Sequence, residues 1–212
     1  MTLTYGRACS RSTIRSSSFG ARLIAAVLCC AMTMTVFTAC GSDDDDNNTP
    51  ETAEIKGIGA HYTFCVSEQM SQLCDYTITY YGTSGKLETE KATWTVANGV
   101  ATWEKTVGNT TIPATFGIKV SAKVKSDAQL EGVMVGNLFP VTQKMFVEGI
   151  STEAKPIWEK TVFLNGNATS HASTSGEKLQ TYFDVMDGHG GMVNKTYTFD
   201  KDGNEIASGK IE

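Results

Sequence analysis

From residue 57 onward, apolar and polar positions alternate in short runs, which is the pattern of β-strands with one buried face. Residues 62–66 (YTFCV) place three apolar side chains on one face, and 76–80 (YTITY) repeat the pattern. The polar stretch 67–73 between them fits a helical turn, and Gly82-Thr83-Ser84-Gly85 closes the second strand with turn residues.

The dipeptide Asn98-Gly99 lies between two alternating runs, 92–97 and 100–103. Asn-Gly in this setting is a strong hairpin signal, because a type I′ turn needs positive φ at both central residues. Counting outward from the turn places Trp94 directly opposite Trp103 at a non-hydrogen-bonded position. A cross-strand aromatic pair of this kind would fix the register.

Further strands are predicted along the second half of the chain. In 116–124 the apolar residues face one way and lysines mostly the other, which is typical of a strand with one wet face. Strands are also predicted at 158–164 and 179–186, and a closing hairpin at 196–199 and 205–208 around Asp202-Gly203. Loops are expected at 166–176 and 187–191. No clear element is predicted for residues 127–156, because glycines and Pro140 interrupt their apolar runs.

One pentapeptide, Trp-Glu-Lys-Thr-Val, occurs at 103–107 and again at 158–162. Its flanking residues do not align. The repeat is therefore consistent with an internal duplication or with two strands that have similar surroundings.

Short strands separated by turn residues, with little helix, predict an all-β fold. We expect an immunoglobulin-like β-sandwich over 57–212 as one domain; a small antiparallel β-barrel is the alternative.

Residues 1–39 differ from the rest of the chain. They contain four arginines and no acidic residue, and an apolar run follows at 23–37. A basic segment, a short apolar segment and small residues before the cut are the layout of a secretory signal. The run is shorter than the roughly 20 residues that span a bilayer, although a core helix or an uncleaved anchor is the alternative interpretation.

The end of this run, Phe37-Thr38-Ala39-Cys40, resembles the bacterial lipobox, in which the cysteine receives a diacylglyceryl group and signal peptidase II cleaves before it. The resemblance implies lipidation of Cys40. Its two acyl chains would hold the protein at a membrane, since stable anchoring takes more than one chain.

An acidic tether, 40–56, follows the cysteine. Ser42 and the aspartates Asp43, Asp44, Asp45 and Asp46 resemble the export signal that sends Bacteroidetes-type lipoproteins to the outer face of the outer membrane. Such a run is also simply a solvated, disordered segment. We expect the protein to face the cell exterior, with a periplasm-facing anchor as the alternative.

The charge balance argues against a nucleic-acid partner. All four arginines lie in 1–39, so 14 of the 18 basic residues remain against 23 acidic ones, a formal charge of −9. Besides Cys40, Cys65 and Cys74 remain after cleavage, an even number in an oxidising compartment. We expect a Cys65–Cys74 disulfide, with two buried thiols as the alternative.

No catalytic motif is present, so the sequence predicts a protein that is not an enzyme and needs no cofactor. The three histidines, His61, His171 and His189, show no metal-ligand spacing. Residues 200–205 (DKDGNE) place oxygen atoms at alternate positions, as Ca²⁺ ligands do, but a hairpin turn accounts for the same residues. We therefore predict no metal site.

Three tryptophans, Trp94, Trp103 and Trp158, could form a stacking platform for a glycan on a surface protein. Trp94 and Trp103 share a face with Val96 and Ala101, which favours a place in the core instead.

The stretch 62–125 contains Asp-Tyr-Thr-Ile-Thr-Tyr at 75–80 and Ile-Pro-Ala-Thr-Phe-Gly-Ile-Lys-Val at 112–120. In these motifs it resembles a group of small uncharacterised Bacteroidales lipoproteins with an immunoglobulin-like sandwich, and the resemblance departs at 92–107. It implies a fold and an outer-membrane location but no chemistry. We expect a non-enzymatic binding or adhesion module with a glycan or protein ligand. A fimbria-like structural or envelope-assembly subunit, or an accessory protein of a glycan-uptake system, is the alternative.

Overall fold

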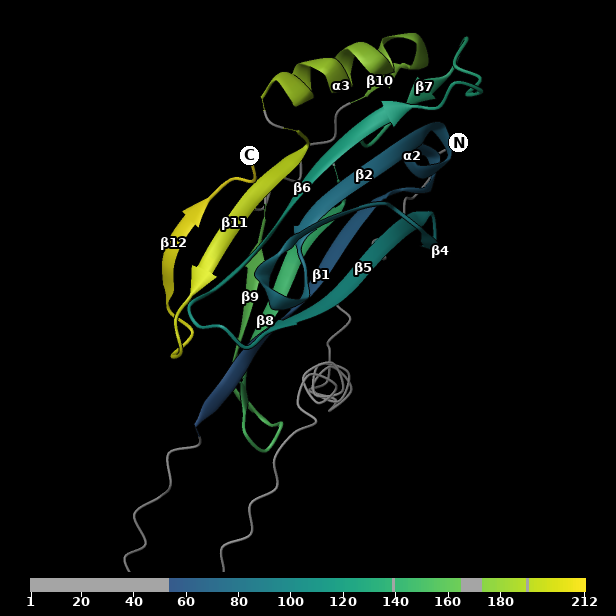
Figure 1. Cartoon of the computed structure of the whole chain (residues 1–212). Coiled ribbons are helices and arrows are strands. Elements are labelled where there is room, and N and C mark those ends of the chain that lie inside the picture. The colour runs from purple at the N-terminus through teal and green to yellow at the C-terminus, as the bar shows by residue number, and fades with distance from the viewer. Residues whose placement is uncertain (1–53, 139, 165–172, 190) are drawn as a thin grey trace, which may run out of the picture.

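Two five-stranded antiparallel sheets lie face to face in the computed structural model of the chain (Figure 1). The structure describes residues 54–138, 140–164, 173–189 and 191–212. The first sheet, sheet A, has the order β4 (Thr95–Ala97), β5 (Val100–Asn109), β1 (Ile55–Ser67), β8 (Thr142–Ser151) and β9 (Pro156–Phe163). The second, sheet B, has the order β12 (Glu205–Gly209), β11 (Val193–Phe199), β6 (Ala114–Val124), β2 (Cys74–Tyr81) and β3 (Leu87–Lys91).

The remaining elements are short. A two-stranded ribbon joins β7 (Met134–Val135) to β10 (Thr174–Ser175). The helices are α2 (Glu68–Leu73), η1 (Thr83–Gly85), η2 (Gly176–Lys178) and α3 (Leu179–Gly188). The prediction of an all-β sandwich is confirmed, and the two sheets do not close into the alternative barrel.

The core lies between the sheets and is built by alternation along the strands. In β1 the side chains of Tyr62 and Phe64 face inward and are fully buried. In β6 the inward side chains of Phe116, Ile118 and Val120 are also fully buried. The strands predicted at 62–66, 76–80 and 116–124 are therefore present, with the predicted faces inside.

Helix α2 begins where its cap residue allows. Ser67 has extended backbone angles, and its hydroxyl accepts a 3.3 Å hydrogen bond from the Met70 amide, so it is an N-cap. The predicted helical turn at 67–73 is confirmed, and it carries the chain from sheet A to sheet B.

The Asn98-Gly99 hairpin is confirmed, with φ of +52° and +75° at its two central residues. The predicted Trp94–Trp103 pair is wrong, because the β4–β5 ladder ends at Thr95 opposite Thr102. Beyond that point the chain leaves β5, and the Trp94 ring packs edge-on against Tyr76 of sheet B, with ring centroids 5.3 Å apart.

The predicted strand at 179–186 is wrong, since these residues lie in α3. Leu179, Tyr182, Phe183 and Met186 follow the 3.6-residue period of a helix, and Leu179 and Phe183 are fully buried. The helix also takes in Asp187 and Gly188 of the predicted loop. Most of the predicted loop at 166–176 lies outside the described residues. The strands predicted at 158–164 and around Asp202-Gly203 are present as β9, β11 and β12.

The two copies of Trp-Glu-Lys-Thr-Val occupy equivalent places in sheet A. Trp103 of β5 pairs with Phe64 of β1, and Trp158 of β9 pairs with Gly149 of β8. A twofold axis normal to the sheet, through the His61–Phe146 pair, exchanges β1 with β8 and β5 with β9. The chain between β1 and β5 is much longer than the chain between β8 and β9. The two copies of the pentapeptide therefore occupy equivalent positions in the sheet, although the strands they pair with precede them by different lengths of chain.

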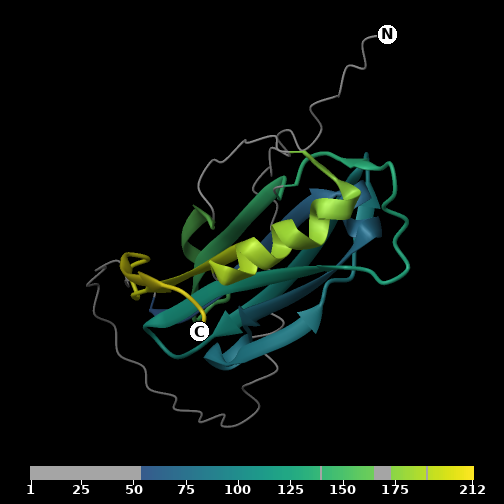
Figure 2. The ribbon, with the colours of Figure 1, turned by 90° about the horizontal axis from the view of Figure 1, so that it is seen from above.

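The sandwich has two distinct ends. At the entry end β1 begins at Ile55, beside the turns at 82–86, 110–113, 152–155 and 200–204. At the far end lie α2, the Asn98-Gly99 turn, residues 125–138 and α3, which Figures 1 and 2 place over the end of the sheets. The start of β1 and the helices α2 and α3 thus lie at opposite ends of the domain.

Candidate functional site

Polar contacts hold the segments of the far end in place against one another. The Glu68 amide donates to the carbonyl of Gly99 at 2.9 Å, which joins α2 to the hairpin turn. The Gln69 side chain donates to the carbonyl of Met134 at 3.1 Å, which joins the same helix to β7. These contacts fix three segments that are distant in sequence into one surface.

Three further hydrogen bonds hold this surface together and attach it to sheet B. The Lys125 ammonium group donates to the carbonyls of Ser71 and Gln72 at 3.0 and 2.8 Å, where it caps the C-terminal end of α2. The Gln180 side chain accepts from the Val124 amide at 2.9 Å, which ties α3 to the end of β6. The segments of the far end therefore form one surface, held together by hydrogen bonds, rather than a set of independent loops.

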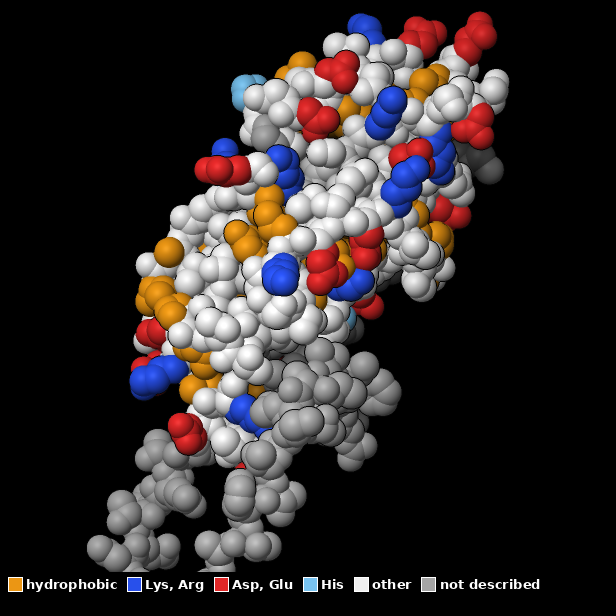
Figure 3. Space-filling model, viewed as in Figure 1, with side chains coloured by type: hydrophobic (Ala, Val, Ile, Leu, Met, Phe, Trp, Pro, Cys, Tyr) orange, Lys and Arg blue, Asp and Glu red, His pale blue; other side chains and the backbone are white. Residues whose placement is uncertain are grey.

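Large apolar side chains are exposed on the segments of the far end and on chain next to them. Four residues from different segments are between 44% and 64% exposed: Val96, Met134, Val141 and Val185. Figure 3 shows apolar side chains between acidic and basic ones at this end of the molecule. Exposed apolar side chains among charged ones are groups that a partner can contact.

The three tryptophans do not form the platform that was considered as one possibility. Trp103 is 2% exposed and lies in the core, where its ring packs against Tyr62 and Tyr80 with centroids 6.4 and 5.7 Å apart. Trp94 and Trp158 are half-buried and pack against different rings, Tyr76 and Phe199. The place in the core that was favoured for these two residues is confirmed for Trp103, and Trp94 packs half-buried against the core.

Trp103 helps to join the two sheets along one side of the sandwich, the β3–β5 seam. Its indole N–H donates to Glu90 of β3 at 2.9 Å, and Lys105 of β5 forms a 2.8 Å ion pair with the same carboxyl group. Desolvation opposes ionisation of Glu90, but hydrogen bonds from Lys105, Trp103 and Tyr80 lower its pKa. Desolvation also raises the pKa of Tyr80, to about 12, so this phenol remains a hydrogen-bond donor. The cluster joins the two sheets along the β3–β5 seam.

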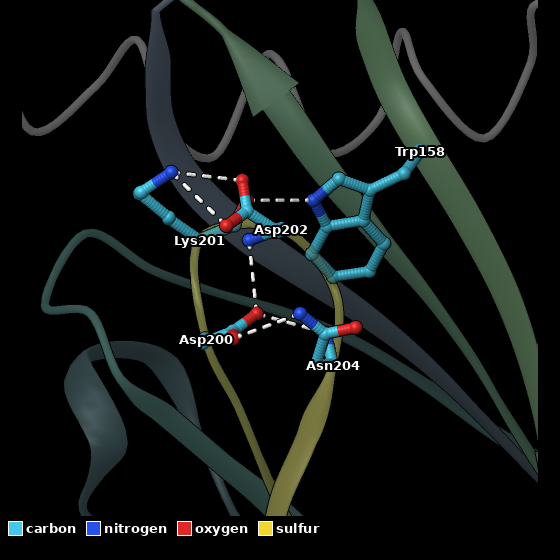
Figure 4. A network of polar contacts seen from close by, with 5 residues as sticks. All are labelled: Trp158, Asp200, Lys201, Asp202 and Asn204. Carbon is cyan, nitrogen blue, oxygen red and sulfur yellow. Dashed lines mark hydrogen bonds and ion pairs between the residues drawn. The ribbon is translucent and has the colours of Figure 1, made fainter.

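Trp158 joins the two sheets on the opposite side of the sandwich, between β9 and the β11–β12 turn (Figure 4). Its indole N–H donates to the carbonyl of Lys201 at 2.9 Å, in the turn between β11 and β12. Two glycines make room for the ring: a Cβ at Gly203 would lie 2.7 Å from its Cδ2 atom, and a Cβ at Gly149 would overlap its Nε1 atom. The two equivalent tryptophans of the repeated pentapeptide thus each form a hydrogen bond that links sheet A to sheet B.

The turn at 200–204 uses its own oxygen atoms. Asp200 accepts from the amides of Asp202 and Asn204 and from the Asn204 side chain, at 2.8–3.0 Å (Figure 4). Side-chain and backbone hydrogen bonds from Asn204 lower the pKa of Asp200. This is the side-chain turn expected of Asp and Asn, and it accounts for the alternating oxygens without Ca²⁺. Within the described ranges, no group of three or more His, Cys, Asp or Glu residues could hold a metal ion.

The predicted Cys65–Cys74 bridge is not formed in the structure. Strand alternation explains why. Cys65 lies between Phe64 and Val66, which face the core, so its own side chain leaves sheet A on the outer face. Cys74 belongs to the core, where burial raises its thiol pKa to about 12. Both side chains are buried, on opposite sides of sheet A, as in the stated alternative.

The arrangement closest to a catalytic one lies on the outer face of sheet A. His61 Nδ1 is 2.8 Å from the Thr106 hydroxyl, and His61 Nε2 is 3.4 Å from Glu104. A hydroxyl, an imidazole and a carboxylate are the parts of a hydrolytic triad. However, strand N–H groups lie in the plane of the sheet, while the hydroxyl stands off its face. None of them is aimed to stabilise an oxyanion.

Several predicted residues lie outside the described part of the chain: Cys40, Ser42, the aspartates Asp43 to Asp46, and His171. His189 is exposed at the end of α3. Within the described residues, no helix is long and apolar enough to span a bilayer. The surface at the far end could not be predicted from the sequence, because its segments come from four separate places in the chain.

Comparison of the chain with protein-family models, with curated proteins and with solved structures found no match.

Proposed function

We propose that this chain is an outer-membrane lipoprotein, anchored through lipid on Cys40, and that its sandwich is a non-enzymatic binding or adhesion module. The observation that carries the proposal is the opposition of the two ends. The tether would join the domain at the entry end, where β1 begins at Ile55. The far end, with its exposed apolar residues, would then point away from the membrane.

The length of the tether supports this orientation. Fourteen residues, 41–54, separate Cys40 from β1, and an extended chain spans up to about 3.5 Å per residue. The domain could therefore stand clear of the lipid headgroups while its lipidated end remains at the surface. The acidic residues of the tether would favour an extended, solvated chain because like charges repel.

A binding role is favoured over catalysis by the character of the far end. It offers exposed apolar side chains on segments held by hydrogen bonds, which is what a protein or glycan partner can use. We propose that the partner is a glycan or protein at the cell exterior. No nucleic acid is proposed, because the mature chain is strongly acidic.

A structural or envelope-assembly role is the second candidate, and it is favoured by one strand. Among the described residues β9 pairs only with β8, and it exposes Ile157 and Phe163, at 43% and 51%. An open edge of this kind can accept a strand from a partner. Pro156 and Lys160 on the same strand oppose such pairing, so this candidate ranks second.

The binding proposal is tested with the mature chain carrying Cys40→Ala, which keeps the domain soluble. We expect this protein to bind at least one surface glycan on a glycan array or one protein of an outer-membrane extract. Val185→Glu combined with Met134→Glu should weaken that binding at least tenfold, because both residues lie on the far end.

The matched control is Ile206→Glu, which changes an equally exposed residue on β12, away from the far end. It should leave the binding unchanged. Binding that Ile206→Glu abolishes and the double variant spares would contradict the proposed surface. Assembly of the protein into oligomers through β9, with no ligand bound, would favour the second candidate.

A further inference from the structure

Two carboxyl groups face each other across the last two strands of sheet A. Glu148 of β8 is paired in register with Glu159 of β9. Since Met145 and Val147 of β8 face the core and are fully buried, Glu148 faces the outer side of the sheet. Glu148 is nevertheless only 1% exposed, whereas Glu159 is exposed.

No positive charge stands beside the pair on the described strands. On β1 the residue opposite Glu148 is Gly59, which has no side chain, and the next outward residue is His61. On β8 itself the nearest outward charge is Lys144, four residues away, and β5 offers Glu104. Lys160 of β9 turns to the other face, where its ammonium group lies 5.9 Å from the Phe199 ring.

Glu148 therefore has little to stabilise a negative charge. Its Oε1 atom has no hydrogen-bond partner among the described residues. Like charges directly opposite each other on adjacent strands are destabilising. Burial, with the charge of Glu159 adding to it, raises the pKa of Glu148 to about 7.

We propose that Glu148 and Glu159 form a proton-linked latch, which holds the edge strand β9 on sheet A when Glu148 carries a proton and loosens it when that proton leaves. The proton goes to solvent, and no other bond changes. Because β9 is an edge strand that pairs only with β8 among the described strands, the added repulsion acts on a strand that can separate without breaking a second strand pairing. β9 also carries Trp158, so loosening it would weaken the seam that this residue fastens.

The sign of the pH dependence follows from the raised pKa. Below about pH 4.5 the carboxyl group is protonated whether β9 is closed or open, so the latch adds no pH dependence there. Between about 4.5 and 7 the closed strand retains a proton that the open one releases. Closing should therefore become less favourable as pH rises, by up to about tenfold per pH unit in this window.

Hydrogen exchange of the mature chain with Cys40→Ala, followed by NMR at several pH values, tests the latch. After correction for intrinsic exchange rates, the opening constant of the β9 amides should rise by about ten- to a hundredfold from pH 5 to pH 8. Glu148→Gln should remove this rise, because a neutral amide cannot titrate. Glu159→Gln should reduce it. Glu104→Gln, on the same face but far from the pair, should leave it unchanged.

Three results would overturn the proposal. One is a rise in opening with pH that persists in Glu148→Gln. Another is an equal rise at the amides of β6 and β11, which would place the effect in the whole domain rather than in β9. The third needs no variant: a direct carbon-13 titration of the wild-type Glu148 carboxyl group that gives a pKa near 4.5.

Discussion

Trp103→Ala is expected to destabilise the domain by about 3–5 kcal/mol, the range found for truncating a large buried aromatic residue. The side chain is 2% exposed and packs against Tyr62 and Tyr80. Its loss would leave a cavity in the core and remove the hydrogen bond to Glu90. In a domain of this size each kcal/mol changes Tm by roughly 2–4 °C, so thermal and urea unfolding followed by circular dichroism would detect the effect.

Two further variants separate packing from hydrogen bonding at this seam. Trp103→Phe keeps most of the ring and loses the N–H donor, so it should cost less, about 1.5–3 kcal/mol. Glu90→Gln keeps an acceptor and loses the ion pair with Lys105, which is more than a third exposed and should contribute less than about 1 kcal/mol. A Trp103→Ala protein as stable as the wild type would refute the seam described here.

Gly117→Ala is expected to cost about 3 kcal/mol, because strand β11 leaves no space for a side chain at this position of β6. A Cβ there would overlap the Lys195 carbonyl oxygen and lie 2.6 Å from the Thr196 Cα atom. Both atoms belong to backbone, so neither can turn aside as a side chain could. The two strands would have to separate.

The shift of β6 would also disturb a contact between the two sheets. The Gly117 amide donates to the Tyr62 hydroxyl at 3.1 Å, and this hydroxyl donates to the Tyr81 carbonyl at 3.0 Å. Gly136→Ala is the matched control, since a Cβ there meets no atom within 4 Å, and it should change stability by less than about 0.5 kcal/mol. Equal unfolding midpoints for the two variants in urea would show that the β6–β11 contact has been misjudged.

Local signals in the sequence predicted the elements that local chemistry determines. Asn98-Gly99 and Asp202-Gly203 mark turns, because Asn98, Gly99 and Gly203 have the positive φ that Asn and Gly adopt most readily. The alternation in 116–124 predicted a strand of sheet B with its buried face. These features depend on residues that are close in sequence.

The misinterpreted elements depend on packing partners that are distant in sequence. Leu179 and Phe183 fit a helix better than a strand, but a run of eight residues is short enough to be taken for either. Strand β8 was not predicted because Gln143 and Gly149 occupy inward positions and the apolar Phe146 an outward one, which hides the alternation.

The candidate site was still less visible in sequence. The Trp94–Trp103 pair assumed that a hairpin ladder continues, but Trp94 gains more by packing against Tyr76 of the other sheet. The expected disulfide counted cysteines without the direction of their side chains, which a single residue of register decides. The far end joins segments that no pattern in the sequence connects.

The most direct test of the account is the chemical identity of the first residue of the mature protein. The protein should be extracted from cell membranes with detergent and its N-terminal peptide analysed by mass spectrometry. The account predicts that the chain begins at Cys40, with the mass of a diacylglyceryl thioether and acyl chains added to it. A mature chain that begins elsewhere, or one that begins at Cys40 with an unmodified thiol and is found in the soluble fraction, would contradict it.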